Sequence, residues 1–195
     1  MTRGRPKQFD EREALQAAME VFWKKGYEAA SCEELLAAMK INCGSMYATF
    51  GDKKALFEKA FELYVETVHS KVTDILNGPG TPLENIRALI EGWGEFAAHP
   101  ECRGCFVTNS IVELGLSSQH SVVQRSHQLI EAMRGAFEKT LQDARDRGEL
   151  TNPCSPKDLA ATLMNTAIGL TVMSRAGTDL ETLRGIVKTT LTLLH

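Results

Sequence analysis

Two cysteines three residues apart, Cys102 and Cys105, carry the strongest chemical signal in the second half of the chain. They could be ordinary thiols, with Cys105 buried among the apolar residues that follow it. They could instead form a redox- or electrophile-sensitive pair, because Arg103 could stabilise a thiolate and a second thiol lies within reach. A third interpretation is a metal site that adds His99 and His120 as ligands, although a single C-x-x-C is weak evidence for one.

Common enzyme motifs are missing from the sequence. It contains no G-x-G-x-x-G, no P-loop, no H-E-x-x-H and no G-x-S-x-G. We therefore expect a protein without enzyme activity, without a cofactor and without a resident metal.

The segment from Ser31 to Phe57 predicts two short helices joined by a tight turn, followed by a third helix. Ser31 and Glu34 have the spacing of a capping box. The turn is Lys40-Ile41-Asn42. Such a pair of helices is a helix-turn-helix unit, whose second helix fits the major groove of DNA. The sequence therefore predicts that residues 43–50 bind double-stranded DNA.

Small and polar side chains dominate this second helix, and they are the candidates for contact with DNA. Gly44 and Ser45 allow close approach of the backbone, and Thr49 offers a methyl group to thymine and a hydroxyl to a base or phosphate. Met46 and Phe50 are assigned to the core by their spacing. The candidate DNA-binding residues of this region are Ser31, Asn42, Cys43, Gly44, Ser45, Ala48 and Thr49.

A basic stretch of four residues precedes the first predicted helix. Arg3-Gly4-Arg5-Pro6 resembles the core of an AT-hook, in which arginines enter a narrow minor groove. The alternative is a disordered, solubilising tail. The position just ahead of the first helix favours a DNA-binding arm that uses Arg3 and Arg5.

Charge and composition are those of an ordinary globular protein of 195 residues, with 43% hydrophobic residues and a net charge of −3. Residues 1–60 contain ten Lys/Arg and nine Asp/Glu, whereas residues 61–195 contain twelve and sixteen. The mildly acidic remainder suggests a different kind of ligand there. We expect no signal peptide, no membrane span, five free cysteines and a cytoplasmic location.

Helix signals run along the whole chain, and no segment alternates like a strand. The sequence predicts an all-α fold of nine helices. They are expected at about 11–25, 32–39, 43–50, 53–76, 82–99, 104–114, 122–147, 156–176 and 179–194, the last capped by Thr178 with Glu181. Asn77-Gly78-Pro79-Gly80 is the clearest break.

Residues 159–173 contain no charged residue. A helix that is apolar on every side must be buried on two sides. It could be the central helix of the core, or one side could form the interface of a homodimer. A dimer would let two helix-turn-helix units read two half-sites.

An effector pocket in the second part of the chain would need apolar walls and a few polar groups. Met and aromatic residues at helical spacing can equally be plain core. Asn109 and Asn165 stand out as amides within apolar helices, because a buried amide needs a partner. The candidate ligand-binding residues are Trp93, Phe96, Cys105, Phe106, Asn109, Met133, Phe137 and Met164, with Met173 as a further lining residue.

Three strings of the first 57 residues resemble the N-terminal domain of TetR-family transcriptional regulators. They are Ala-x-x-Val-Phe with Lys-Gly-Tyr in 18–27, Gly-Ser-Met-Tyr-x-x-Phe in 44–50, and Lys-x-x-Leu-Phe in 53–57. Thr49 stands where the family often has His or Tyr, Cys43 where it often has a polar or basic residue, and Ala48 is also small.

The resemblance implies a DNA-binding domain over residues 1–52 and a ligand-binding and dimerisation domain over residues 53–195. It implies phosphate contacts by Tyr47 and Lys53, and a homodimer through the last two helices, at about 156–194. It further implies a repressor that an unknown small apolar or reactive molecule releases from a palindromic operator. The alternative is a thiol-based redox or electrophile sensor that uses Cys102 and Cys105. A helical protein-binding module is disfavoured, because basic residues around a glycine-opened helix suit DNA better.

Overall fold

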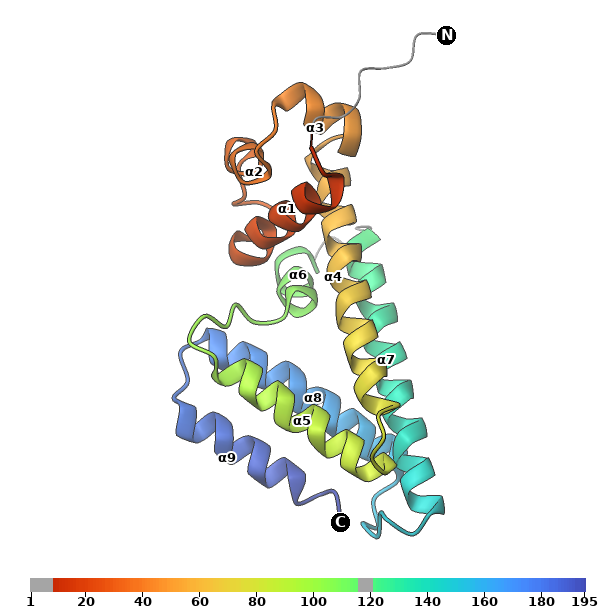
Figure 1. Ribbon diagram of the computed structural model, residues 1–195. Helices are drawn as coiled ribbons and strands as arrows, with labels where there is room; N and C mark the ends of the chain where they lie inside the picture. Colours follow the sequence, from red (N-terminus) through yellow and green to blue (C-terminus); the bar gives the residue numbers. More distant parts are fainter. Residues whose placement is uncertain (1–8, 116–120) are drawn as a thin grey trace, which may run out of the picture. The chain divides into compact units, whose positions relative to one another are not determined.

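The computed structural model describes residues 9–115 and 121–195, which form nine α-helices and no strand (Figure 1). The predicted all-α fold and helix count are thus confirmed for this part of the chain. The helices are α1 (Glu11–Lys25), α2 (Cys32–Met39), α3 (Cys43–Phe50), α4 (Lys53–Leu76), α5 (Pro82–Ala98), α6 (Phe106–Leu114), α7 (Ser121–Asp146), α8 (Pro156–Arg175) and α9 (Leu180–Leu191).

Side-chain caps explain why most helices begin where they do. Asp10 accepts hydrogen bonds from the N–H groups of Arg12 and Glu13 at the start of α1. Ser31 with Glu34 and Thr81 with Glu84 form complete capping boxes. Each cap satisfies N–H groups that have no partner within the helix.

The start of α9 differs from the expectation. The cap is Asp179, whose carboxylate accepts from the N–H of Thr182 at 2.8 Å, and the helix begins at Leu180. Thr178 was wrong as the cap. Asp179 also accepts from the hydroxyl of Thr182, and these bonds hold the pKa of Asp179 below its usual value.

The chain divides into two compact units, and the division falls within α4, between Val65 and Glu66. In the first unit, α1, α2 and α3 share a small core with the first half of α4. Phe22 and Phe57, both fully buried, meet edge to face with ring centroids 5.0 Å apart. Trp23 and Tyr64 pack in the same way at 5.0 Å. These aromatic contacts hold α1 against α4.

In the second unit, α5 packs against α7, α8 and α9, while α6 packs against α7 (Figure 1). One buried cluster joins Ala97 of α5, Leu170 of α8 and Leu183 of α9. Because α5 and α8 are covered by neighbours on several sides, they contribute many of the buried apolar residues.

The tail after α9 is bound to other elements of this unit. The guanidinium of Arg87 donates to the carbonyl of Leu194, and the amide of Asn152 donates to that of Leu193 at 2.9 Å. The N–H groups of Thr151 and Asn152 both donate to the carbonyl of His195. The tail therefore connects α9 with α5 and with the α7–α8 connection.

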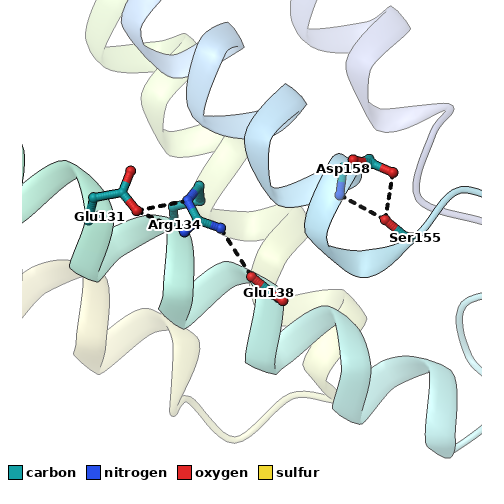
Figure 2. A network of polar contacts seen from close by, with 5 residues as sticks. All are labelled: Glu131, Arg134, Glu138, Ser155 and Asp158. Atoms are coloured by element: carbon teal, nitrogen blue, oxygen red, sulfur yellow. Dashed lines mark hydrogen bonds and ion pairs between the residues drawn. The ribbon is translucent and has the colours of Figure 1, made fainter.

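Figure 2 shows two sets of polar contacts, one on the surface of α7 and one at the start of α8. The guanidinium of Arg134 donates to Glu131 one turn before it, at 2.8 Å, and to Glu138 one turn after it, at 3.1 Å. Ser155 caps α8 by accepting from the N–H of Asp158. Exposed helix pairs of this kind add little to stability, because water screens the charges.

Among the described residues, no helix is both long enough and apolar enough to cross a lipid bilayer.

Candidate nucleic-acid interface

The turn between α2 and α3 is built by its own backbone and by one side chain. Lys40 adopts the left-handed conformation (φ 55°) and ends α2. Asn42 then caps α3, accepting from the N–H of Ser45 at 2.8 Å. Leu35, Met46 and Phe50 are buried beneath the turn. Local sequence thus positions α3 as the second helix of a helix-turn-helix unit.

One side of α3 is buried and the other is open to solvent. Met46 and Phe50 point into the core, as predicted. The exposed residues are Cys43, Gly44, Tyr47 and Ala48, and Ser45 and Thr49 are half-buried at the edge. Tyr47 is 53% exposed, the largest of the exposed side chains of this helix. The structure therefore brings the candidate residues of α3 together on one surface, on which every residue except Tyr47 is small.

Gly44 lies on this surface with room around it. A methyl group on its Cα would come no closer than 3.4 Å to any neighbour, the side-chain oxygen of Asn42. The fold itself therefore does not require glycine at this position. What glycine provides is a surface that another molecule can approach closely.

Lys53, at the first position of α4, is held by residues of the α1–α2 connection. Its ammonium donates to the carbonyl of Glu28 at 3.4 Å and lies 4.8 Å from the centre of the Tyr27 ring. Burial, followed by the nearby charges of Glu28 and Asp52, raises the pKa of Tyr27. The sequence did not predict this contact of Lys53, because Lys53 and Glu28 are 25 positions apart in the chain.

Ser31 is exposed, but its hydroxyl already makes hydrogen bonds with Glu34. Its hydroxyl accepts from the N–H of Glu34 at 3.2 Å and lies 3.1 Å from the Glu34 carboxylate. Glu34 also pairs with the ammonium of Lys25, across from α2 to α1. The bond to Lys25 and those to Ser31 lower the pKa of Glu34 to about 2. The hydroxyl of Ser31 thus serves the start of α2. Arg3 and Arg5 lie outside the described residues.

The candidate effector residues of the second unit differ widely in exposure. Trp93 is half-buried and its ring lies 5.5 Å from that of Phe137. Phe96 is 38% exposed. The buried candidates are Phe106, Met133, Phe137 and Met164.

The two amides singled out in the sequence have different surroundings. Asn109 is half-buried and donates to the carbonyl of Arg103 at 3.0 Å, which stabilises the chain just before α6. Asn165 is exposed on α8, so the expectation that it is a buried amide was wrong. No sequence signal pointed to Ser110, which is 1% exposed and whose hydroxyl has no hydrogen-bond partner among the described residues.

Cys102 and Cys105 lie half-buried on the connection that leads into α6. Cys105 occupies the cap position of α6, and its side chain makes no capping hydrogen bond. Within the described parts of the chain, no three His, Cys, Asp or Glu side chains form a group that could hold a metal ion. His120 lies outside those parts.

Comparison with known proteins finds the same family in the N-terminal and C-terminal parts of the chain. Residues 14–60 match the family model "Bacterial regulatory proteins, tetR family", and residues 82–190 match "Tetracyclin repressor-like, C-terminal domain". The HTH-type transcriptional repressor ComR of Escherichia coli (strain K12) is 31% identical over 98% of this chain and 92% of its own length. The uncharacterised HTH-type regulator YezE of Bacillus subtilis (strain 168) is 30% identical over 98% of this chain and 99% of its own.

Among solved structures, the fold matches a cysteine mutant of the TetR-family regulator CifR complexed with 26-bp double-strand operator DNA. The TM-score is 0.83 with 28% identity, covering 96% of this chain and 98% of that one. The helix-turn-helix geometry and both family models agree. This chain belongs to the TetR family of DNA-binding transcriptional regulators.

Proposed function

We propose that this protein is a repressor that binds a palindromic operator as a homodimer and is released by a small apolar or reactive molecule. The observation that carries the proposal is the exposed small-residue face of α3, presented by a helix-turn-helix unit. Relatives named as repressors support the mode of action. We place its action in the cytoplasm, because its ligand is an operator on a bacterial chromosome.

In this proposal the face of α3 enters the major groove. Asn42, Cys43, Gly44, Ser45 and Thr49 lie close to base edges, and Ala48 packs near the thymine methyl groups. Tyr47 and Lys53 contact phosphates, with Lys53 already held in position by Glu28 and Tyr27. Ser31 contributes through the start of α2, and Arg3 and Arg5 reach into the adjacent minor groove.

The proposed dimer uses the surfaces of α8 and α9 that this chain leaves open. On α8, four exposed or half-buried residues are spaced three or four positions apart, so that they share one side of the helix: Ala161, Asn165, Gly169 and Val172. Small residues at such spacing allow two helices to approach closely. Val172 is exposed although it is apolar, and Leu180 at the start of α9 is exposed too. A symmetric pair of chains would cover both.

The proposed effector site lies in the second unit, with Trp93 and Phe137 as its aromatic pair. Phe96, Phe106, Met133 and Met164 are its apolar residues, and Cys105 and Asn109 lie at its polar end. No charged side chain is among the described buried residues of this unit, so an uncharged effector fits best.

A thiol-based response is the second candidate, favoured by the position of Cys105 at the start of α6 and by the half-buried Cys102 three residues before it. A related regulator was solved as a cysteine mutant. In the proposed step, hydrogen peroxide takes two electrons and two protons from the two thiols. One S–S bond forms, the O–O bond breaks, and two waters leave.

The test of operator binding starts from the wild-type protein and a library of random duplexes. We expect it to enrich a palindromic site. Ala48→Glu should abolish binding to that site, because it places a carboxylate on the exposed face of α3 opposite the phosphates. Ala132→Glu, the same change at an exposed position of α7, should bind like wild type. Failure to enrich any duplex, or equal binding by both variants, would contradict the proposal.

The thiol response is tested on the same duplex after peroxide treatment, with alkylation and mass spectrometry to locate the oxidised thiols. A disulfide between Cys102 and Cys105 with a weakened complex supports it. Unchanged DNA affinity after complete oxidation of this pair would eliminate it.

A further inference from the structure

The C-terminal end of α3 depends on a lysine from another helix. The chain turns at Gly51 (φ 86°), whose N–H donates to the carbonyl of Tyr47 at 3.1 Å. The last two carbonyls of the helix are those of Thr49 and Phe50. Both accept from the ammonium of Lys59 of α4, at 3.3 and 3.4 Å.

This contact supplies a positive charge at the C-terminal end of α3, which the sequence of α3 itself lacks. The last carbonyls of a helix have no partner within it, and a cation there is favourable because the helix dipole is negative at that end. The last turn of α3 contains no basic residue. Lys59 supplies the charge from the second turn of α4.

The ring of Phe50, at the same end of α3, contacts two further side chains. The ammonium of Lys59 lies 5.6 Å from the centre of the Phe50 ring, and the ring of Phe9 lies 6.5 Å from it on the chain that enters α1. Phe50 is buried, whereas Lys59 is exposed, so the stem of Lys59 covers this junction from the solvent side. All of these residues belong to the first unit.

We propose that Lys59 is a positioning residue for operator recognition. It fixes α3 against α4, so that the exposed face of α3 enters the groove in one orientation. The inference rests on the proposed operator binding. Two carbonyl oxygens already engage its ammonium, so its effect should be on sequence discrimination and not on general attraction to DNA.

The experiment measures affinity of the full-length protein by fluorescence anisotropy, across a series of salt concentrations. The probes are the duplex enriched by the wild-type protein and a scrambled duplex of equal length. The variants are Lys59→Met, Lys59→Arg and Lys53→Ala, and Lys71→Met serves as an exposed control on α4.

Lys59→Met should lower the ratio of operator affinity to scrambled-duplex affinity by about tenfold, comparable to the loss of one base contact. The dependence of log affinity on log salt should keep its slope, and Lys59→Arg should restore most of the ratio. Lys53→Ala, at a proposed phosphate contact, should weaken both duplexes alike and lower the slope by about one unit. Lys71→Met should behave like wild type.

Two results would overturn the inference. An unchanged ratio in Lys59→Met shows that the lysine does not position α3. A loss that is equal on both duplexes, with a slope lower by about one unit, shows a direct phosphate contact instead. If Lys59→Met does not fold, as judged by its thermal unfolding, Lys59→Gln is measured by the same criteria. Failure of the wild-type protein to enrich any duplex would refute the operator proposal itself, before any variant is compared.

Discussion

At the scale of single residues, Ser110 stands out as a buried hydroxyl without a partner among the described residues. Leaving such a group unpaired costs about 1–3 kcal/mol. We therefore expect Ser110→Ala to raise the free energy of unfolding in urea by about 1 kcal/mol.

Ser126 is the matched control for this prediction. It is also a buried serine on a helix, but its hydroxyl donates to the carbonyl of Val122 at 2.7 Å. Ser126→Ala removes that bond and should leave stability unchanged or lower it by about 1 kcal/mol. A Ser110→Ala variant that is less stable than Ser126→Ala would show that the hydroxyl of Ser110 is satisfied in solution.

Glu34 makes the stability of the first unit depend on pH. Its pKa is lowered from 4.5 to about 2 in the folded protein by Lys25 and Ser31. The ionised form is therefore favoured by folding. This stabilisation is fully present above about pH 4.5 and is lost as the pH falls toward 2.

We expect Glu34→Gln to be less stable than wild type at pH 6, with a difference that shrinks steadily between pH 4.5 and 2. Urea unfolding at several pH values measures it. Glu33→Gln removes the adjacent exposed charge without touching the pair with Lys25, and is the control. A difference that stays constant across this range would contradict the role given to the pair.

At the scale of elements, one glycine lies at the contact of α5 with α9. A methyl group on Gly94 would lie 2.6 Å from a methyl of Val187, closer than real side chains approach. Gly94→Ala should lower the free energy of unfolding by about 1–3 kcal/mol, because the two helices must move apart.

Gly92, two residues earlier on α5, is the internal control, since nothing lies within 4 Å of its added methyl group. Gly92→Ala should raise stability by up to about 1 kcal/mol through helix propensity. Adding Val187→Ala to Gly94→Ala should cost less than the two single changes together. Strict additivity in urea unfolding would show that the two residues do not collide.

At the scale of the whole molecule, the proposed homodimer predicts that the open face of α8 controls assembly. Asn165 is exposed at the middle of that face. Asn165→Arg should convert the dimer to a monomer in sedimentation velocity and weaken operator binding, because two like charges would meet near the symmetry axis. Ala132→Arg on α7 should remain dimeric. A dimeric Asn165→Arg protein that keeps full operator affinity would place the interface elsewhere.

Most of the helices could be predicted from the sequence, because caps and apolar spacing are local signals. Ser31 with Glu34, and Thr81 with Glu84, place helix starts by hydrogen bonds that span only three residues. The prediction that Thr178 caps α9 was wrong, and the reason is equally local. The neighbouring Asp179 offers a carboxylate to Thr182 and takes the cap.

The helix-turn-helix unit and its exposed candidates were likewise visible in the sequence, since burial of Met46 and Phe50 determines which residues of α3 face outward. Tertiary structure alone decided the contacts between distant residues. It placed Lys53 on Glu28, Lys59 on the end of α3 and Gly94 against Val187. It also left Asn165 exposed and the hydroxyl of Ser110 without a partner in the described part of the chain. The physical reason is that a cap or an apolar stripe depends on neighbours within one or two turns, whereas these contacts exist only after separate helices have packed together.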